Sequence, residues 1–175
     1  GDVEWTEAEP LVQPARETAR EEILEAAAVT ITNAKQPVFL VGGGAVHSGA
    51  AAEVQFFARK TGIPVVNTLM GIGVFPGSDR QCLGLTGMHG HIPANMAVAN
   101  ADVLIVAGSR FSERVTGDRN RYVGKKTIIQ LDIDPSEVDK NVMTALPLVG
   151  DMKENLTKLS ERVQKLEIEH WWHTI

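Results

Sequence analysis

Cysteine and long apolar runs are both scarce in this sequence. Cys82 is the only cysteine among the 175 residues, so no internal disulfide can form, whereas secreted domains of this size often use several. No stretch approaches the roughly 20 apolar residues of a membrane-spanning helix. The first ten residues are acidic and polar and lack the charged-then-apolar order of a signal peptide. We therefore expect a cytoplasmic protein with no membrane partner.

Excess positive charge is also missing. The 17 Lys and Arg residues are outnumbered by 22 Asp and Glu residues, which gives a formal net charge of -5. Proteins that bind nucleic acid normally gather Lys and Arg into a basic stripe, and this sequence has none. The hydrophobic fraction of 43% and the charged fraction of 22% are close to those of ordinary globular chains. One globular domain without a nucleic-acid partner is the expectation.

Short apolar runs alternate with amphipathic stretches, a pattern typical of βα units around a parallel sheet. Five or six such runs are present, and a helix precedes the first of them. The strands are expected at 38–41, 63–67, 103–107, 127–132 and 146–149. Helices are expected at 14–34, at 48–61, after His91 and at 152–168. The sequence therefore predicts an α/β fold, a three-layer, Rossmann-like open parallel sheet of five to six strands with helices on both faces.

The two ends of the chain differ from this pattern. After the last predicted helix the chain ends in His170-Trp171-Trp172-His173, where two histidines lie three residues apart but no third metal ligand is near. Large aromatic groups exposed at a terminus suggest missing contacts, because such groups are normally buried. We interpret 1–13 and 169–175 as linkers to missing domains on either side and 14–168 as a central domain of dinucleotide-binding type.

The loops after the strands are where a ligand is expected, because ligands of open parallel sheets bind beyond the carboxyl ends of the strands. The first loop is Gly42-Gly43-Gly44, whose missing side chains allow either a tight turn or close approach of a ligand to the backbone. An NAD-binding fingerprint needs a small residue where His47 stands and an acid where Asn67 stands. The ordinary NAD motif is therefore absent.

Two further loops offer groups that suit a flat ring. Thr68-Leu69-Met70 follows a predicted strand and brings a hydroxyl and a soft thioether. Met88-His89 brings a histidine that can donate to a ligand or shuttle a proton, although a lone loop histidine is more often merely solvated. Both loops are candidates for contact with a ring. For His89, contact with a ligand and simple exposure to solvent both remain open.

Charged residues stand in the remaining loops. Arg110 and Arg114, which follow Gly108, can pair with pyrophosphate oxygens or form ion pairs with nearby acids. Asp132 can accept hydrogen bonds from ribose hydroxyls, whereas Asp134 can cap the turn that follows it. No Ser-His-Asp set, catalytic carboxylate pair or cysteine nucleophile occurs at a spacing that suggests a reaction. The residues alone predict a nucleotide-cradling domain without catalytic residues.

Five motifs, in this order, resemble those of one protein family. Over about residues 36–159 the chain is similar to the central domain of the catalytic large subunit of acetolactate synthase (acetohydroxyacid synthase), a thiamine-diphosphate enzyme. Any single motif would be weak, but the ordered series argues against chance. The motifs are Gly42-Gly43-Gly44-Ala45, Thr68-Leu69-Met70-Gly71, Gly87-Met88-His89-Gly90, Arg110-Phe111-x-x-Arg114-Val115-Thr116-Gly117 and Asp132-Ile133-Asp134-Pro135, closed by Val149-Gly150-Asp151.

The resemblance implies a parent enzyme with thiamine diphosphate and magnesium. Such an enzyme decarboxylates pyruvate and transfers the two-carbon unit to a second 2-oxo acid, in the synthesis of branched-chain amino acids. The family's thiamine-activating glutamate lies in a preceding domain and its metal and diphosphate ligands in a following one, so this chain alone is expected to be inactive. The implied partners are the other domains of the parent chain, further copies in a homo-oligomer and a possible regulatory subunit.

The resemblance also implies a DHS-like fold of the NAD/FAD-binding type that carries FAD, with no redox role for the flavin in the carboligation. The cofactor-binding residues are then Gly43, Gly44, Thr68, Leu69, Met70, Met88, His89, Gly108, Arg110, Arg114, Val115, Asp132, Ile133 and Asp151. One departure is Ser112-Glu113, which stands where the family usually has two aspartates and changes the charge beside the flavin path.

Two alternative functions remain open. The chain can be the central domain of another thiamine-diphosphate carboligase or decarboxylase, acting on glyoxylate, sulfoacetaldehyde or an acyl-CoA. It can also be a stand-alone flavin-binding electron-transfer module. The motifs Met88-His89-Gly90 and Arg114-Val115-Thr116-Gly117 favour acetolactate synthase over the first alternative, and Trp171-Trp172 weighs against the second.

Overall fold

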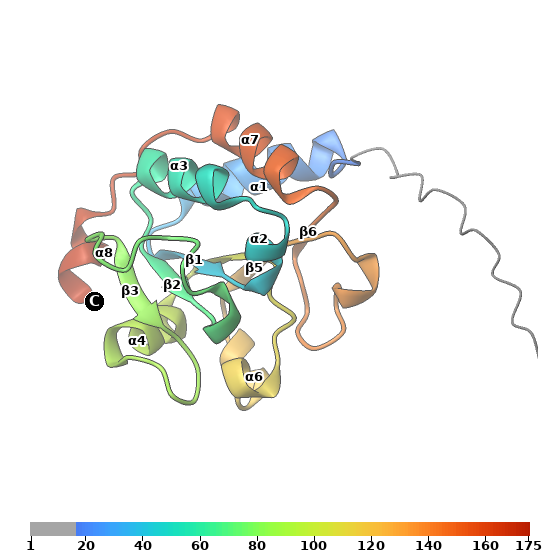
Figure 1. The fold of residues 1–175 in the computed structure, drawn as a ribbon. Helices are drawn as coiled ribbons and strands as arrows, with labels where there is room; N and C mark the ends of the chain where they lie inside the picture. The colour runs from blue at the N-terminus through green and yellow to red at the C-terminus, as the bar shows by residue number, and fades with distance from the viewer. Residues whose placement is uncertain (1–16) are drawn as a thin grey trace, which may run out of the picture.

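The computed structural model describes residues 17–175 and contains a six-stranded, entirely parallel sheet with strand order β3-β2-β1-β4-β5-β6 (Figure 1). This architecture confirms the predicted open Rossmann-like sheet. The strands are β1 (Pro37–Val41), β2 (Val65–Asn67), β3 (Cys82–Leu85), β4 (Val103–Ala107), β5 (Thr127–Asp132) and β6 (Leu146–Val149). The α-helices are α1 (Glu21–Asn33), α2 (Gly43–His47), α3 (Ala51–Thr61), α4 (Ile92–Asn100), α5 (Glu113–Thr116), α6 (Arg119–Val123), α7 (Met152–Arg162) and α8 (Glu169–Thr174), and short 3-10 turns lie at Leu69–Gly71 and Pro135–Glu137.

The centre of the sheet is apolar on both faces. Every residue of β1 and β4 is buried, and the two strands pair in register from Pro37 opposite Val103 to Val41 opposite Ala107. Continuous apolar runs of this kind are typical of parallel strands, because helices cover both faces of the sheet. These two strands therefore form the rigid base of the loops that follow them.

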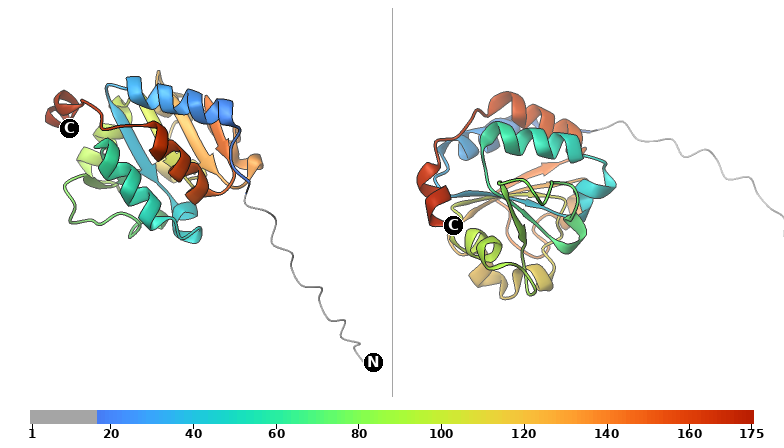
Figure 2. Two further views of the ribbon diagram at one scale, coloured as in Figure 1. Left: turned by 90° about the horizontal axis from the view of Figure 1, so that it is seen from above. Right: turned by 60° about the vertical axis from the view of Figure 1, so that its left-hand side comes forward.

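Helices cover the sheet in two layers. α1, α3 and α7 lie side by side on one face, whereas α4 and α6 lie on the other (Figures 1 and 2). Small residues on α4, Ala94 and Ala97, are completely buried and let this helix approach the sheet closely. On the opposite face, α7 buries Leu156 and Leu159 against its neighbours. The predicted helices on both faces are thus confirmed.

Several predicted boundaries are wrong. The first helix begins at Glu21 within the described residues, and Pro14, its expected start, lies outside them. The helix expected at 48–61 begins at Ala51, and the short helix α2, which was not predicted, precedes it, with Gly49 at a left-handed φ of 63° between the two. The last core helix ends at Arg162 rather than at 168. The edge strand β3 was not predicted, because glycine at position 84 is more typical of a loop and because the residues of this strand are only partly buried.

The expectation that both terminal tryptophans are exposed is also wrong. Trp171 is 1% exposed and donates from Nε1 to the Pro37 carbonyl oxygen at 3.0 Å, at the start of β1. Trp172 is half-buried and donates to the Gly62 carbonyl oxygen at 3.0 Å. Buried indoles need a partner for their N–H, and both find a backbone oxygen. Residues of α8 therefore form part of the domain's packing.

Replacing Trp171 with alanine should destabilise the domain strongly. The change removes a fully buried ring and leaves the Pro37 oxygen without its donor, so we expect a loss of about 3 to 5 kcal/mol. Urea unfolding of the chain measures it. His173→Ala, an exposed position on the same helix, is the matched control and should change the unfolding free energy by less than about 0.5 kcal/mol. Equal small effects at both positions would contradict the packing of α8.

Candidate functional site

The loops named by the sequence gather at one edge of the sheet. All six strands are parallel, so the segments after β1, β2, β3, β4, β5 and β6 leave from the same side. Between the central strands β1 and β4 the order reverses, with α3 covering one face after β1 and α6 covering the other after β4 (Figure 1). Such a switch point is where open α/β sheets bind ligands. We refer to this set of loops as the carboxyl edge.

Two of the predicted glycines meet each other across the switch point. The Gly44 N–H donates to the Gly108 carbonyl oxygen at 2.9 Å. A Cβ added at Gly44 would lie 2.6 Å from the Gly108 Cα, and one added at Gly108 would lie 2.5 Å from the Gly44 Cα. Gly108 also has a φ of +64°. The tight-turn interpretation therefore accounts for both glycines, and the Gly44 N–H is already used within the protein.

Apolar side chains extend from the carboxyl edge into solvent. The exposed fractions are 68% for Leu69, 66% for Met70, 72% for Met88 and 70% for Ile133. Thr68, in contrast, is only 6% exposed, so its neighbours rather than its hydroxyl dominate the surface of that loop. Several large exposed apolar groups on adjacent loops indicate a contact surface for a ligand or for another protein surface.

The cationic residues of the carboxyl edge are free of ion pairs within the described part of the chain. Arg110, Arg114 and His89 are all exposed, and neither arginine comes within ion-pair distance of a described carboxylate. The ion-pair alternative raised for the arginines is therefore not observed. Their guanidinium groups are available to an anion.

Two asparagines that the sequence did not single out hold these loops in place. Asn95 on α4 accepts from the Gly87 N–H at 2.8 Å and donates to the Gly87 carbonyl oxygen at 3.0 Å. Asn141 donates to the Arg110 carbonyl oxygen at 2.8 Å. Asn95 could have been noticed in the sequence as a polar residue directly after Ala94, which is buried. Asn141 gave no such signal, because its partner Arg110 lies 31 residues away in the chain. Both act on the backbone of the loops.

Backbone strain and further links fix the segment after β4. Phe111 is buried, has a φ of 51° and packs edge-on against Tyr122 with ring centroids 6.1 Å apart. A left-handed φ is costly for a non-glycine residue and persists only where surrounding contacts enforce it. The Met88 N–H donates to the Arg114 carbonyl oxygen at 2.9 Å and joins the loop after β3 to α5. Val115, also on α5, is half-buried.

The carboxylates near β5 have opposite electrostatic environments. Burial raises the pKa of Asp132 above its usual range, although the N–H of Asp134 donates to its Oδ1 at 3.1 Å. Hydrogen bonds from Ser136 lower the pKa of Asp134, with smaller contributions from the charges of Lys140 and Arg110. The Asp134 Oδ1 accepts from the Ser136 N–H at 2.9 Å, which confirms its predicted role as a turn cap.

Asp151 is placed by the start of α7. It follows β6 and is the N-cap residue of that helix, where its Oδ1 accepts from the N–H groups of Lys153 and Glu154. Its own N–H donates to the Glu17 carbonyl oxygen at 2.7 Å. Aspartate is a strongly preferred N-cap residue, so helix capping is a structural reason for its presence.

Cavities and other candidate features lie elsewhere. Two cavities in the described part of the chain, one between α3 and α7 and one near the amino ends of the strands, do not include the carboxyl-edge residues. Among residues 17–175, no group of three or more His, Cys, Asp or Glu side chains is arranged to hold a metal ion. No helix in that span has the length and apolar character to cross a membrane.

The fold and its loops define a Rossmann-like α/β domain with a switch point between β1 and β4. The family model of the thiamine pyrophosphate enzyme central domain matches residues 24–159, and the chain belongs to this family. Similar proteins include the acetolactate synthase large subunit of Buchnera aphidicola, 39% identical over 150 residues, and the probable acetolactate synthase large subunit of Methanocaldococcus jannaschii, 46% identical over 145 residues. The large subunit of acetolactate synthase isozyme 3 of Escherichia coli is 39% identical over 153 residues.

These matches cover most of this chain but little of the relatives. Each alignment spans 83% of the chain and 24% to 27% of the relative. The chain therefore corresponds to about a quarter of the length of the proteins it matches.

Substituting Gly108 should disturb the switch point more than its backbone angle alone predicts. Gly62 also has a left-handed φ, +78°, but nothing lies within 4 Å of an added Cβ. We expect Gly62→Ala to cost about 1 to 2 kcal/mol. Gly108→Ala adds a collision with Gly44 and should cost a further 1 to 3 kcal/mol or so. Urea unfolding compares the two, and equal losses would show that the loops are not in contact.

Opposite pH effects should follow from the two carboxylates near β5. The folded-state pKa of Asp132 is raised, so its contribution to stability is present at low pH and is lost as the pH rises through that pKa. The folded-state pKa of Asp134 is lowered, so its contribution is present above 3.8 and is lost on acidification. Relative to the parent, Asp132→Asn should therefore become more stable as the pH rises above 3.8, whereas Asp134→Asn should be less stable at neutral pH, by a deficit that shrinks as the pH falls below 3.8.

Asparagine keeps an oxygen acceptor at both positions, so the comparison isolates the charge. Chemical unfolding at several pH values gives the difference between each variant and the parent. Differences that do not vary with pH would contradict the assigned environments.

Proposed function

We propose that this chain is the central cofactor-binding domain of an acetolactate synthase, with FAD as its cofactor. The observation that carries the proposal is that exposed Arg110 and Arg114, which form no ion pair with a described carboxylate, stand along the carboxyl edge with the exposed apolar side chains of Leu69, Met70, Met88 and Ile133. Membership of the thiamine pyrophosphate enzyme family and the names of the similar proteins support the specific enzyme.

The residues of the carboxyl edge suit the chemistry of FAD. Arg110 and Arg114 supply cations for a pyrophosphate, and guanidinium forks match phosphate oxygens well. Met70 and Met88 supply polarisable surface for a flat ring. Because the Gly44 N–H is bonded to Gly108, we assign the pyrophosphate mainly to side chains rather than to the glycine backbone.

The remaining predicted contacts belong to the same proposal. Asp132 lies at the end of β5, where a carboxylate can accept hydrogen bonds from ribose hydroxyls. Ile133 and Val115 add apolar surface, and His89 adds a ring nitrogen. Ser112 and Glu113 are exposed at the start of α5, so the single carboxylate there lies beside the path proposed for the flavin.

In the proposed parent enzyme, pyruvate is decarboxylated and its two-carbon unit joins a second 2-oxo acid. Thiamine diphosphate with magnesium supplies the stabilised carbanion chemistry for this reaction. This chain's part is to position FAD and to join the domains on either side, with 1–13 and 169–175 as the connecting segments. Burial of Trp171 is consistent with a connecting segment that packs on the central domain before it continues to the next domain.

Flavin titration and pyruvate consumption, measured on the same purified chain, test this proposal. We expect FAD fluorescence and absorbance to change on binding, and no pyruvate consumption with thiamine diphosphate and magnesium present. Turnover of pyruvate by the chain alone would contradict the assignment as a central domain. Rapid electron transfer from dithionite-reduced, bound flavin to an added acceptor would instead support an electron-transfer module.

Loss of one arginine should weaken FAD binding measurably. Arg110→Ala removes a charge-assisted hydrogen bond, which is worth about 1.5 to 3 kcal/mol, or roughly 10- to 150-fold in Kd. Arg80→Ala is the matched control, because Arg80 is exposed in the turn before β3, at the other end of the sheet. Fluorescence titration with FAD compares the variants. An unchanged Kd for Arg110→Ala would place the pyrophosphate elsewhere.

A further inference from the structure

One peptide unit in the loop after β3 is bonded on both sides. The Gly87 carbonyl oxygen accepts from Asn95 Nδ2 at 3.0 Å. The N–H of the same peptide unit, which belongs to Met88, donates to the Arg114 carbonyl oxygen at 2.9 Å. The C=O and N–H of a trans peptide lie in one plane and point in opposite directions. Asn95 on α4 therefore orients the group that bonds to Arg114 on α5.

Asn95 stands on a fixed support and has a defined amide orientation. Ala94 and Ala97 of the same helix are completely buried, so α4 is anchored on the sheet. The Asn95 Oδ1 accepts from the Thr86 hydroxyl at 2.9 Å and from the Gly87 N–H at 2.8 Å. Turning the amide over would set its NH2 group against the Gly87 N–H, donor against donor. The nitrogen therefore faces the Gly87 carbonyl oxygen.

Glycine at position 87 makes this support from outside the loop necessary. A Cβ added there would lie 2.7 Å from the Arg114 carbonyl oxygen, so a larger side chain would keep the loop away from α5. Glycine, however, reaches many other backbone angles at little cost. The Gly90 N–H also donates to the Gly87 carbonyl oxygen, at 2.9 Å, but it belongs to the same loop. Asn95 ties the peptide to a helix that packs on the sheet.

The far side of this peptide reaches an arginine assigned to the cofactor. Arg114 belongs to α5, which has only four residues, and so short a helix is marginal by itself. Its side chain is exposed, as is that of Met88. The backbone of Arg110 has a different support, because its carbonyl oxygen accepts from Asn141 at 2.8 Å. The two arginines therefore depend on different asparagines.

We infer that Asn95 is a positioning residue for the proposed FAD site, because it fixes the peptide between Gly87 and Met88 and thereby the place of Arg114. Three of the four hydrogen-bonding positions of its amide are used within the protein, so it acts through the loop. The inference rests on the function proposed for the carboxyl edge, which gives Arg114 an anion to bind. The hydrogen bonds of Asn95 can be tested without that function.

Amide hydrogen exchange of the chain without cofactor tests these bonds. Asn95→Ala should raise the exchange rate of the Met88 N–H about tenfold or more, because its bond to the Arg114 oxygen opens more often. The Gly108 N–H, which donates to the Leu131 carbonyl oxygen at 2.9 Å, should change much less. An unchanged rate at Met88, or equal rises at Met88 and Gly108 as general destabilisation predicts, would overturn the inference.

Asn100→Ala is the matched control. Asn100 is exposed on the same helix, and its Nδ2 donates to the Met96 carbonyl oxygen at 2.8 Å within that helix. Its replacement should leave both the Met88 exchange rate and the Kd for FAD within about twofold of the parent. Faster exchange at Met88 in this variant would mean that any weakening of α4 loosens the loop, which contradicts a specific role for Asn95.

Asn95→Asp keeps the test available if Asn95→Ala does not fold. Aspartate can still accept from the Thr86 hydroxyl and the Gly87 N–H, but it cannot donate to the Gly87 carbonyl oxygen. The Met88 N–H should again exchange faster than in the parent. Exchange at the parental rate would show that the donated bond does not orient the peptide, and would overturn the inference.

FAD titration of double variants tests whether Asn95 acts through Arg114. Asn95→Ala alone should raise the Kd for FAD about tenfold, as expected when one charge-assisted bond is misplaced. In an Arg114→Ala background the same change should raise the Kd less than about threefold, because the guanidinium that it positions is gone. In an Arg110→Ala background it should keep its full effect, since Asn141 supports that segment. The full effect in the Arg114→Ala background would overturn the inference.

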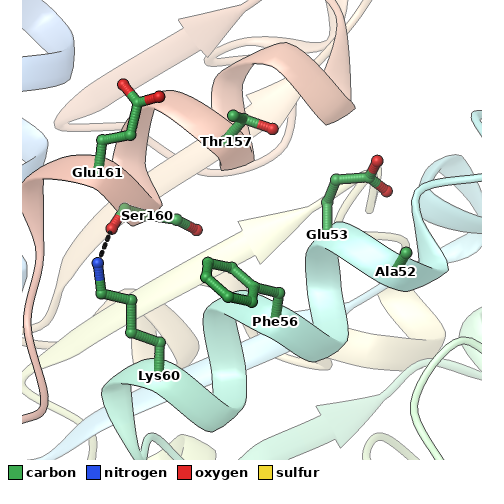
Figure 3. Close-up of a pocket in the computed structure, with 7 residues that line it drawn as sticks. All are labelled: Ala52, Glu53, Phe56, Lys60, Thr157, Ser160 and Glu161. Atoms are coloured by element: carbon green, nitrogen blue, oxygen red, sulfur yellow. Dashed lines mark hydrogen bonds between the residues drawn. The ribbon is translucent and has the colours of Figure 1, made fainter.

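The place at which FAD binds separates a failure of this inference from a failure of the proposed function. NMR shifts on addition of FAD should lie at Met88 and Arg114. Shifts at Phe56 and Lys60, which line the cavity between α3 and α7 (Figure 3), would place the cofactor away from the carboxyl edge. That result, or no binding by the parent, would contradict the FAD proposal. Hydrogen exchange at Met88 would still decide whether Asn95 holds the loop against α5.

Discussion

The contact between Gly44 and Gly108 is the constraint on which the carboxyl edge depends. It joins the segments after the two central strands at the point where the strand order reverses. With a Cβ on either residue the backbones would collide, so the loops could not close over the ends of β1 and β4. The hydrogen bond also uses the Gly44 N–H within the protein. Glycine at these two positions therefore allows close packing of the two loops.

Sequence patterns predicted the central elements well, because their signals are local and strong. The strands Val103–Ala107, Thr127–Asp132 and Leu146–Val149 were placed at their observed bounds. The edge strand Cys82–Leu85 was missed, since its glycine and partial burial resemble a loop. Trp171 was misjudged for a different reason. Its partner, the Pro37 oxygen, is 134 residues away, and only the folded chain brings them together.

The site followed the same division between local and long-range signals. The loops named from the sequence do leave the same edge of the sheet, because parallel strands have their carboxyl ends on one side. The residues that hold those loops in place were not predicted. Asn95 and Asn141 bind backbone carbonyls and amides, and neither residue type nor spacing indicates which backbone group a side chain will reach. Phe111 likewise gives no sign in the sequence of its left-handed backbone, which depends on packing against Tyr122.

The exposed apolar side chains of the carboxyl edge bear on how a central domain would hold its cofactor in the proposed enzyme. Small-molecule sites commonly bury 70 to 90% or so of their ligand, and that requires walls on several sides. At the carboxyl edge, Leu69, Met70, Met88 and Ile133 are each about two-thirds exposed or more. A flavin resting on these side chains would cover them while leaving its own far side in water. Neighbouring domains would then complete the site, so the same apolar surface that holds the cofactor would also join the domains.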